Sequence, residues 1–284
     1  MAKQPSRPIV ILGADGQLGR GLTARFPEAR APGLDQLDIT NKEQLATFDW
    51  PKNGLIINAA AYTQVDRSQE PEGRLIAWQV NASAVAELAK ITRQCQATLI
   101  HFSTDYVFDG QTFPHEEDEP FSPLGVYGQS KAAGDLAALT CDQVYLIRTS
   151  WVIGDGGNFV RTMLSLAEKG VSPSVVTDQT GRPTFVKQLV EAVEYLIERG
   201  AAWGVYNVSN DGPIISWADL AEAVFSQVRP DIKVKPVTTA DYILGRALVA
   251  PRPPHGEFNL AKIKSTGLKL RPWRQDLIDY LDLP

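Results

Sequence analysis

A glycine-rich turn near the start of the chain is the feature that most constrains its fold. Gly13, Gly16 and Gly19 follow the apolar run Ile9–Leu12 and open a helical pattern. Glycines placed in this way allow a tight turn and a close approach of backbone N–H groups to a diphosphate, at a helix N-terminus that carries partial positive charge. The turn predicts a dinucleotide site, although its G-x-x-G-x-x-G spacing departs from the commoner G-x-G-x-x-G and similar turns also serve as plain corners. The predicted cofactor contacts within it are Gly13, Asp15, Gly16, Gln17, Leu18 and Gly19.

Apolar runs and helical patterns alternate along the first half of the chain. The apolar runs predict buried strands, and the patterns between them predict helices. Strands that alternate with helices indicate a parallel sheet with right-handed crossovers. We therefore predict an α/β fold with a Rossmann-type, doubly wound parallel sheet. The predicted strands are 9–12, 54–58, 97–102 and 144–148, and the predicted helices are 18–26, 78–94 and 126–139.

The pattern changes after Trp151, where residues 171–184, rich in Gly, Pro and Thr, separate two helical patterns. Ser216 and Asp219 have the spacing of a helix-capping box before an apolar-periodic run that ends at Val228. We predict a dinucleotide-binding Rossmann domain over residues 1–150 and a smaller C-terminal lobe, mainly for substrate binding, over residues 151–284. About residues 186–210 are expected to return to the Rossmann domain. The other helices predicted in this half are 158–169, 186–199 and 274–281.

The composition excludes several classes of partner. The net charge of -5 and the pI near 5.3 argue against a nucleic-acid or anionic membrane surface, since such surfaces need clustered Lys and Arg. No apolar run approaches the length of a membrane span, and Met1 to Pro8 contains no apolar stretch that could act as a signal peptide. Cys95 and Cys141 have neither paired nor metal-ligand spacing, so no disulfide is expected and a reducing cytoplasm is the predicted setting.

A dinucleotide site of this kind should carry a second signal, an acid about 20 residues beyond the turn that holds the ribose hydroxyls. Residues 29–41 offer Asp35 and Asp38, but neither stands out as the ribose acid and no Arg follows them. Asp38 is predicted to accept from the adenine amino group while Ile39 packs on the ring. An equal alternative is that Asp38 only caps a helix that begins at Thr40 or Asn41. The sequence leaves NADPH and NADH open as the cofactor.

Small residues follow the predicted strand that ends at Asn58. Ala60, Ala61 and Tyr62 would stand near the carboxyl end of this strand, where parallel sheets of this kind bind ligands. Small side chains leave room for a cofactor, so these three residues are predicted to contact it. Simple helix–sheet packing is the less favoured alternative.

Tyr127 and Lys131 are four residues apart, so on a helix they share one face. A nearby ammonium lowers the pKa of a phenol, and a Tyr so tuned can donate a proton to a carbonyl oxygen as hydride arrives at the carbon. Lys131 can also reach cofactor ribose hydroxyls. Ser103 and Thr104, at the end of a predicted strand, are expected to point into the same crevice, where Thr104 would bond the substrate oxygen. Thr104, Tyr127 and Lys131 are the predicted catalytic set. Taken alone, the Tyr127–Lys131 spacing is also common in surface pairs without a role, and hydroxyl residues such as Ser103 and Thr104 also occur as caps at strand ends.

No other chemistry in the sequence competes well with this set. His101, His115 and His255 lack metal-ligand spacing, and no metal site is predicted. The acidic run at residues 116–119 is expected to be a solvated loop. The sequence contains neither a G-x-S-x-G nucleophile elbow nor a G-x-x-x-x-G-K phosphate loop.

Longer strings in the chain resemble those of dTDP-4-dehydrorhamnose reductases, and they are more specific than the glycine turn. They are Ser-Thr-Asp-Tyr-Val-Phe-Asp-Gly at 103–110, Pro-Leu-Gly-Val-Tyr-Gly-Gln-Ser-Lys at 123–131, Arg-Thr-Ser-Trp-Val at 148–152 and Asp-Gln-Thr-Gly-Arg-Pro-Thr at 178–184. Arg252-Pro-Pro-His255, followed by Asn259 and Leu260, resembles a late substrate-side motif, although that family usually has a single proline before the histidine. The similarity runs from about residue 9 to about residue 280.

The resemblance implies a reductase that uses NADPH or NADH to convert dTDP-4-dehydro-6-deoxy-L-mannose into dTDP-L-rhamnose. It makes Tyr127 the general acid, Lys131 its partner and ribose ligand, and Thr104 the hydroxyl that orients the substrate.

The resemblance also implies substrate contacts. Asp105 would face the substrate, Trp151 would lie against the sugar ring, and Arg182 would pair with the diphosphate. A plain core position is the alternative for Trp151. A homodimer is also implied as an option, since some members of the family dimerise around a metal held by carboxylates, but no metal ligands are assigned in this chain.

Three other functions stay open. They are a 4-ketoreductase of another nucleotide-linked deoxysugar, an epimerase-like enzyme that keeps its cofactor bound, and a non-catalytic regulatory subunit of the same fold that binds an adenosyltransferase. An epimerase would not consume cofactor steadily. A regulatory subunit has no need of Thr104, Tyr127 and Lys131 together, so the reductase is favoured.

Overall fold

A five-stranded parallel sheet forms the centre of the molecule in the computed structural model, which describes residues 7–246 and 248–282. Neighbouring strands all run parallel, and nearly all of their residues are buried, as expected for strands covered on both faces. The predicted α/β class with a Rossmann-type parallel sheet is confirmed. Residues 1–6 of the N-terminus, where no signal peptide is expected, lie outside the described residues. The strand order is β1 (Ile9–Leu12), β2 (Leu55–Asn58), β3 (Thr98–Thr104), β4 (Val144–Thr149) and β9 (Gly204–Asn207).

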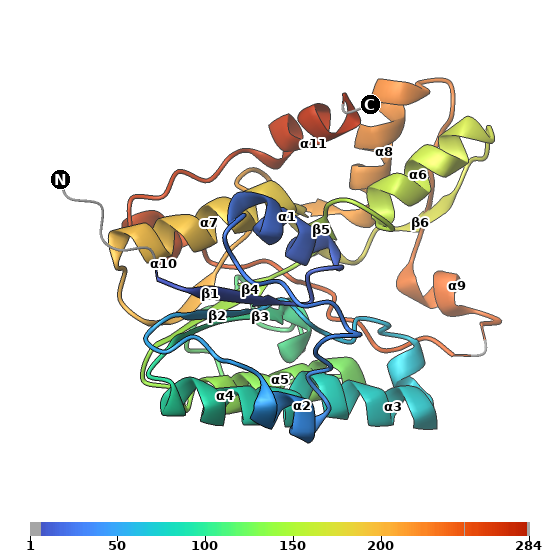
Figure 1. Ribbon diagram of the computed structural model, residues 1–284. Coiled ribbons are helices and arrows are strands. Elements are labelled where there is room, and N and C mark those ends of the chain that lie inside the picture. The colour runs from blue at the N-terminus through green and yellow to red at the C-terminus, as the bar shows by residue number, and fades with distance from the viewer. Residues whose placement is uncertain (1–6, 247, 283–284) are drawn as a thin grey trace.

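Helices cover both faces of this sheet (Figure 1). On one face lie α1 (Gln17–Arg25), α7 (Val186–Arg199) and α10 (Ala261–Ser265). On the other lie α3 (Pro71–Trp78), α4 (Ala84–Gln94) and α5 (Val126–Ala138), with the short α2 (Lys42–Thr47) beside them. After β4 the chain leaves the sheet for the smaller lobe. It then returns, because α7 packs beside α1 and β9 is the last strand of the sheet.

The helix predicted over residues 78–94 begins earlier in the structure than predicted, and a π-helical turn interrupts it. It begins at Pro71, where a proline at the first helical position lacks only an N–H that would have no intrahelical partner anyway. Between α3 and α4 the backbone forms one π-helical turn, η2 (Gln79–Ser83), a feature that is frequent at functional sites. Helical periodicity missed α3 because Pro71 and Gly73 both have low helix propensity.

A smaller lobe lies to one side of the sheet (Figure 1). The predicted capping box is present at the start of one of its helices: Ser216 accepts from the backbone N–H of Asp219, and the Asp219 carboxylate accepts from that of Ser216. The helices of this part of the chain are α6 (Phe159–Glu168), α8 (Trp217–Val228), α9 (Thr239–Ile243) and α11 (Trp273–Leu281). Its short strand pairs are β5 (Val152–Ile153) with β8 (Thr184–Phe185), β6 (Ser174–Val176) with β11 (Lys235–Val237), and β7 (Thr180–Gly181) with β10 (Ile215–Ser216).

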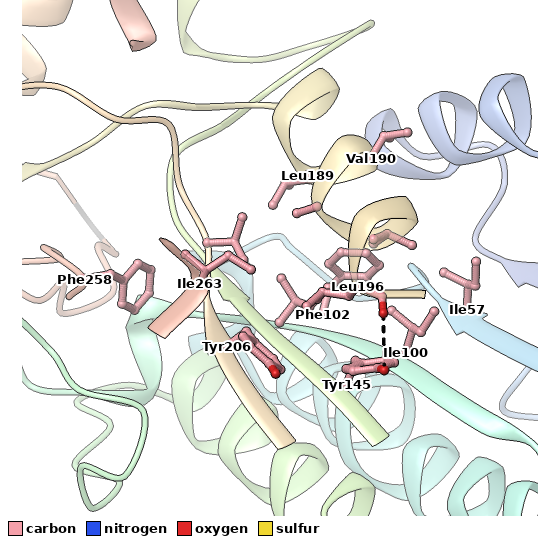
Figure 2. Close-up of a cluster of buried hydrophobic side chains, with 14 of the residues drawn as sticks. Ile57, Ile100, Phe102, Tyr145, Leu189, Val190, Leu196, Tyr206, Phe258 and Ile263 are labelled. Carbon is pink, nitrogen blue, oxygen red and sulfur yellow. Dashed lines mark hydrogen bonds between the residues drawn. The ribbon is translucent and has the colours of Figure 1, made fainter. Parts of the chain in front are cut away.

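The largest apolar core lies between the sheet and α7 (Figure 2). Ile57, Ile100 and Phe102 enter it from the strands, and Leu189 and Leu196 enter it from α7. The Tyr145 hydroxyl donates to the carbonyl oxygen of Leu196 at 3.4 Å, the dashed contact in Figure 2. The lobe has a separate core around the fully buried Trp273 and Phe225.

Two further properties bear on the setting of the protein. Across the described residues, no helix combines the length and the apolar character needed to cross a membrane. Cys95 and Cys141 are both free thiols, and Cys141 is buried.

Candidate active site

The glycine turn closes tightly against the end of β2. Gly13 has φ +74°, a conformation that favours glycine, and a Cβ on it would lie 2.6 Å from the Cα of Ala60. A Cβ on Gly19 would overlap the carbonyl oxygen of Gly13. Gly16, the N-cap of α1, has no side chain that could occupy the N–H groups of the first turn. The turn is therefore a backbone cradle at a helix N-terminus, and it fits the diphosphate of a dinucleotide.

Not every side chain predicted to contact the cofactor faces this cradle. The Oε1 atom of Gln17 accepts from the backbone N–H of Gly154 at 3.0 Å and from Nδ2 of Asn158 at 3.3 Å, so this side chain ties α1 to the lobe. Leu18 packs against the main apolar core. The prediction that Gln17 and Leu18 contact the cofactor therefore applies only to their backbone N–H groups. Asp15 is exposed, at the tip of the turn.

The segment after β2 is held by a buried asparagine that sequence reasoning missed. Asn81, in the π-helical turn η2, accepts from the N–H of Tyr62 at 2.9 Å and donates to the Tyr62 carbonyl at 3.0 Å. Its amide also donates to the Ser130 hydroxyl at 3.1 Å, and Ser130 lies between Tyr127 and Lys131 on α5. Asn81 thus links the predicted cofactor segment, Ala60 to Tyr62, to the helix that carries the catalytic pair.

The side chains of Asp38 and Ile39 have contacts other than those expected from the sequence. The Asp38 carboxylate accepts from the N–H and the hydroxyl of Thr40, both at 2.8 Å, and it is Asn41 that caps α2. The alternative in which Asp38 caps this helix is therefore wrong. Ile39 is buried in the core on the α4 side of the sheet, so it offers no open surface on which a ring could pack. A contact of this segment with adenine stays a prediction for Asp38 and for the backbone of Ile39.

The predicted catalytic residues come together at the carboxyl end of β3. Thr104 is the last residue of β3, and its hydroxyl lies close enough to the Tyr127 phenol to affect the pKa of that group. Lys131, one helical turn beyond Tyr127 on α5, donates from Nζ to the carbonyl oxygen of Phe102 at 2.6 Å. All three side chains are buried. A strand end and a helix face therefore position Thr104, Tyr127 and Lys131 around one point.

The pKa of Tyr127 departs from the prediction. Burial raises the pKa of this phenol above its ordinary value of 10, the nearby Asp105 carboxylate raises it further, and the nearby Thr104 hydroxyl only partly opposes them. The predicted lowering by Lys131 is therefore wrong for this structure, in which the Lys131 ammonium is bonded to the Phe102 carbonyl. The outcome is a phenol that holds its proton at neutral pH.

A buried polar network lies behind Lys131, and it contains two groups that sequence reasoning did not assign. Asp135 is a further helical turn along α5, fully buried, and its carboxylate accepts from the Ser103 hydroxyl at 2.5 Å. Ser103 therefore faces Asp135, which corrects the expectation that it points into the crevice with Thr104. His101 lies 3.7 Å from Asp135 and 3.1 Å from the Asn58 amide, and burial beside Lys131 holds its pKa well below 6.5. The spacing of Lys131 and Asp135, four residues apart, is the one sequence signal that could have identified this carboxylate.

Asp105 is the other buried carboxylate of the site. Its Oδ1 atom accepts from the Thr104 hydroxyl at 2.9 Å, and only 3% of the residue is exposed. Burial raises the pKa of this carboxyl from 3.8 to about 6, although the hydrogen bond from Thr104 lowers it. Asp105 is thus close enough to act on Tyr127 and is itself poised to titrate near neutrality.

The raised pKa of Asp105 predicts a pH dependence of stability. Because the folded state binds this proton more tightly than the unfolded state, the contribution is fully present below about pH 4 and is lost as the pH rises through about 6. Asp105→Asn cannot titrate, so we expect it to remove about 3 kcal/mol of the decline in the free energy of unfolding over this range. Urea unfolding at several pH values measures this, with the exposed Asp118→Asn as the control. Parallel curves for wild type and Asp105→Asn would contradict the assignment.

A groove of about 710 Å³ opens beside the catalytic residues. Tyr106 connects the two, since it lines the groove and its ring packs edge-on against that of Tyr127 with centroids 5.4 Å apart. Trp217 contributes an aromatic wall, and Arg246 and Arg252 contribute positive charge. Arg252 also donates to the Asp66 carboxylate at 3.0 Å, which joins the lobe-side motif to the loop before α3. The groove therefore combines apolar walls with two guanidinium groups.

Trp151 supports this groove from behind and does not line it. Its ring stacks on that of Trp217 with centroids 3.6 Å apart, and its backbone has φ +48°. Trp217, which does line the groove, stands where sequence reasoning had placed Trp151. Of the two readings of Trp151, the structure favours the packing position.

The guanidinium group of Arg182 is hydrogen-bonded to backbone carbonyl oxygens. Its Nε donates to the carbonyl oxygen of Gly212 at 2.9 Å and its Nη1 to that of Phe258 at 3.0 Å. These bonds join three distant segments and keep the guanidinium off the groove lining. The predicted pairing of Arg182 with a diphosphate is therefore not supported, and Arg246 and Arg252 are better placed for it.

The acidic run at residues 116–119 is not simply a solvated loop. Glu119 bonds Nδ1 of the buried His115 at 2.9 Å, and Glu117 accepts from the N–H of Asn207 at 3.1 Å. Glu116 accepts from the Asn259 amide at 2.8 Å. The run thus holds a loop over the end of β9. The expectation of a solvated loop is wrong for Glu117 and Glu119, which are half-buried, whereas Glu116 and Asp118 are exposed.

The parallel sheet, the glycine cradle and the buried Tyr–Lys pair at the end of a central strand define an oxidoreductase of the short-chain type that uses a nicotinamide dinucleotide. Residues 7–283 match the family model described as RmlD substrate binding domain, and the chain belongs to this family. The resemblance seen in the motifs is thereby confirmed.

Named relatives cover almost the whole chain. A dTDP-4-dehydrorhamnose reductase from Mycobacterium tuberculosis is 37% identical over 98% of this chain and 94% of its own. A probable dTDP-4,6-dihydroxy-2-methyloxan-3-one 4-ketoreductase from Streptomyces antibioticus is 36% identical over 94% of this chain and 92% of its own. The crystal structure of a dTDP-4-dehydrorhamnose reductase from Bacillus anthracis in complex with NADP superposes with a TM-score of 0.88, at 32% identity, and covers 98% of this chain and 99% of that one.

Proposed function

We propose that this protein reduces the C4 keto group of dTDP-4-dehydrorhamnose to give dTDP-L-rhamnose, with hydride supplied by a nicotinamide cofactor. The observation that carries the proposal is the buried Tyr127 phenol, close to Thr104 at the end of β3 and joined through the ring of Tyr106 to a groove with an aromatic wall and two arginines. Membership of the family and the names of the relatives support the same reaction.

The reduction needs a hydride for the carbonyl carbon and a proton for the oxygen. The bound nicotinamide supplies the hydride. Tyr127 supplies the proton: as the carbonyl π electrons move onto oxygen, the phenol O–H bond breaks and the new O–H bond forms. The raised pKa of Tyr127 suits a donor, because the phenol is protonated when the substrate binds and the developing alkoxide is a stronger base. Thr104 orients the carbonyl oxygen toward Tyr127.

The other residues position the reactants. Lys131, fixed by the Phe102 carbonyl, would hold the ribose hydroxyls of the cofactor. The cradle of Gly13, Gly16 and Gly19 would receive the cofactor diphosphate through backbone N–H groups. Asp105 would face the sugar beside Thr104.

The groove would hold the nucleotide half of the substrate. Arg246 and Arg252 are the cations for its diphosphate, and the aromatic wall formed by Trp217 suits a flat base or the face of a sugar. In this arrangement residues 151–284 contribute mainly to substrate binding, and α7 and β9 within them serve the dinucleotide domain.

A 4-ketoreductase of another dTDP-linked deoxysugar is the second candidate, supported by the Streptomyces antibioticus relative. The two candidates share the catalytic residues and differ in the sugar that the groove accepts. We place the enzyme in the cytoplasm, in keeping with its free thiols, and retain a homodimer as a prediction from the resemblance.

The reaction is tested by following nicotinamide absorbance while the purified protein is mixed with enzymatically generated dTDP-4-keto sugar. We expect steady cofactor oxidation that needs both protein and sugar, with a product that NMR identifies as dTDP-L-rhamnose. A product with another sugar configuration would favour the second candidate. Folded protein that oxidises neither NADH nor NADPH would exclude both.

A further inference from the structure

The smaller lobe is hydrogen-bonded to the first residue of α1, directly after the glycine turn. The Oε1 atom of Gln17 accepts from the backbone N–H of Gly154 at 3.0 Å and from Nδ2 of Asn158 at 3.3 Å. From α11, the Tyr280 hydroxyl donates to the Gly154 carbonyl oxygen at 2.9 Å, and Nδ2 of Asn158 donates to that hydroxyl at 3.0 Å. Gln17 is therefore the point at which three segments of the lobe meet the dinucleotide domain.

The loop at residues 154–157 fits closely against α1 and α7. A Cβ on Gly154 would lie 2.5 Å from Cγ2 of Val186, so only a glycine allows the loop to approach α7 in this way. Arg20 makes a second link, since its guanidinium donates to the backbone carbonyls of Asp15, at the tip of the glycine turn, and of Asp155, in the loop. The loop is thus held at the glycine turn by side chains on two turns of α1.

Asn158 also begins the helix that forms one wall of the groove. It is the N-cap of α6, and its Oδ1 atom accepts from the backbone N–H of Arg161 at 3.1 Å. One side chain therefore caps α6 with its oxygen and bonds Gln17 with its amide nitrogen. The residues of α6 that line the groove are Phe159, Thr162, Met163 and Leu166.

Gln17 faces the two ligand sites with different atoms. Its backbone N–H lies in the first turn of α1, where N–H groups have no partner within the helix and can bind an anion. Its side chain is bonded to the lobe. A diphosphate on the first turn would fix the backbone of Gln17, and with it the side chain that holds Asn158 and the start of α6.

We propose that Gln17 is a positioning residue that couples the cofactor cradle to the substrate groove. The inference rests on the proposed function, which places the cofactor diphosphate on the glycine turn and the nucleotide of the substrate in the groove. Each ligand should then bind more tightly when the other is present, because both stabilise the same arrangement of α1 and α6. Coupling between two sites is reciprocal and typically about 5- to 150-fold, so we expect at least about fivefold here.

The test measures this coupling by isothermal titration with dTDP, without cofactor and with saturating NADPH or NADH. The probe dTDP carries the nucleotide and diphosphate of the proposed substrate and has no keto group to react. Gln17→Met keeps the backbone N–H and the length of the side chain but removes the acceptor. Asn158→Ser keeps an oxygen that can cap α6 and removes the amide donor.

Gln143→Met is the matched control. It makes the same change at another half-buried glutamine, whose Oε1 atom accepts from the Thr98 hydroxyl at 3.0 Å, at the opposite end of β3 from Thr104. The double variant Gln17→Met/Asn158→Ser completes a cycle with the two single changes. Steady-state kinetics with the dTDP-4-keto sugar add KM as a second readout.

In the wild type, cofactor should tighten dTDP binding, and dTDP should tighten cofactor binding by the same factor. Gln17→Met and Asn158→Ser should each lose most of this factor, and the double variant should lose little more, because both changes break one contact. KM for the sugar should rise in Gln17→Met, while cofactor alone binds nearly as in the wild type, and Gln143→Met should behave as the wild type.

Two sets of outcomes separate this inference from the proposed function. A wild type without coupling, coupling that persists in Gln17→Met, or an equal loss in Gln143→Met would overturn the role of Gln17, even in an enzyme that reduces the keto sugar. A folded protein that binds neither dTDP nor cofactor would overturn the proposed function and this inference with it.

Discussion

Tyr127→Phe is expected to lower turnover by about 10²- to 10⁴-fold, the range that a positioned proton donor contributes. The change removes one hydroxyl and keeps the ring that packs edge-on against Tyr106, so the fold and the groove should persist. Cofactor affinity should stay close to that of the wild type, because Lys131 and the glycine cradle are untouched. Steady-state kinetics with the dTDP-4-keto sugar and titration with NADH measure the two effects separately.

Tyr195→Phe is the matched control for this experiment. It makes the same chemical change on α7, where the Tyr195 hydroxyl donates to the carbonyl oxygen of Thr266 at 2.9 Å, far along the chain from the site. Turnover near the wild-type rate in Tyr127→Phe would show that another group supplies the proton, and Asp105 would then be the first residue to examine.

Asp135→Ala is expected to destabilise the protein by about 3 to 5 kcal/mol, because it leaves a buried ammonium without its counter-charge. Lys131 and Asp135 are both buried on α5, and the Asp135 carboxylate raises the pKa of Lys131 against the lowering caused by burial. The same change leaves the Ser103 hydroxyl without its acceptor. Urea unfolding at neutral pH measures the loss.

Asp135→Asn separates the two causes. The amide oxygen can still accept from Ser103, so this variant should lose the counter-charge alone and be less destabilised than Asp135→Ala. In a double-mutant cycle with Lys131→Met, the combined change should cost less than the sum of the single changes. A loss below about 1 kcal/mol in Asp135→Ala, or strict additivity in the cycle, would contradict a coupled Lys131–Asp135 pair.

Local patterns in the sequence were sufficient to predict the fold class, and they also supplied the catalytic set, which stays a prediction. The glycine turn, the buried strands and the four-residue spacing of Tyr127 and Lys131 each depend on a few consecutive residues. The capping box at Ser216 is equally local, and it was predicted correctly. The structure places Thr104 beside Tyr127 because strand β3 ends where α5 begins to pack on it.

The features that the sequence did not indicate arise from contacts between distant segments. Asn81 has its role because a π-helical turn directs its amide to Tyr62 and Ser130. Trp151 looked like a sugar contact by its motif, but its positive φ and its stacking on Trp217 place it behind the groove wall. The pKa of Tyr127 also depends on such contacts. Burial and the Asp105 carboxylate raise it, whereas the Lys131 ammonium that was expected to lower it is bonded to the Phe102 carbonyl.

Transfer of a labelled hydride tests the central claim most directly. NADH that carries deuterium at the transferable C4 position would be incubated with the protein and the dTDP-4-keto sugar, and the product examined by mass spectrometry and NMR. The account predicts one deuterium per product molecule, bound to C4 of the deoxysugar, and very little labelled product in the same time with Tyr127→Phe. Product that forms without deuterium, or that carries it at another carbon, would contradict reduction of the C4 keto group at this site.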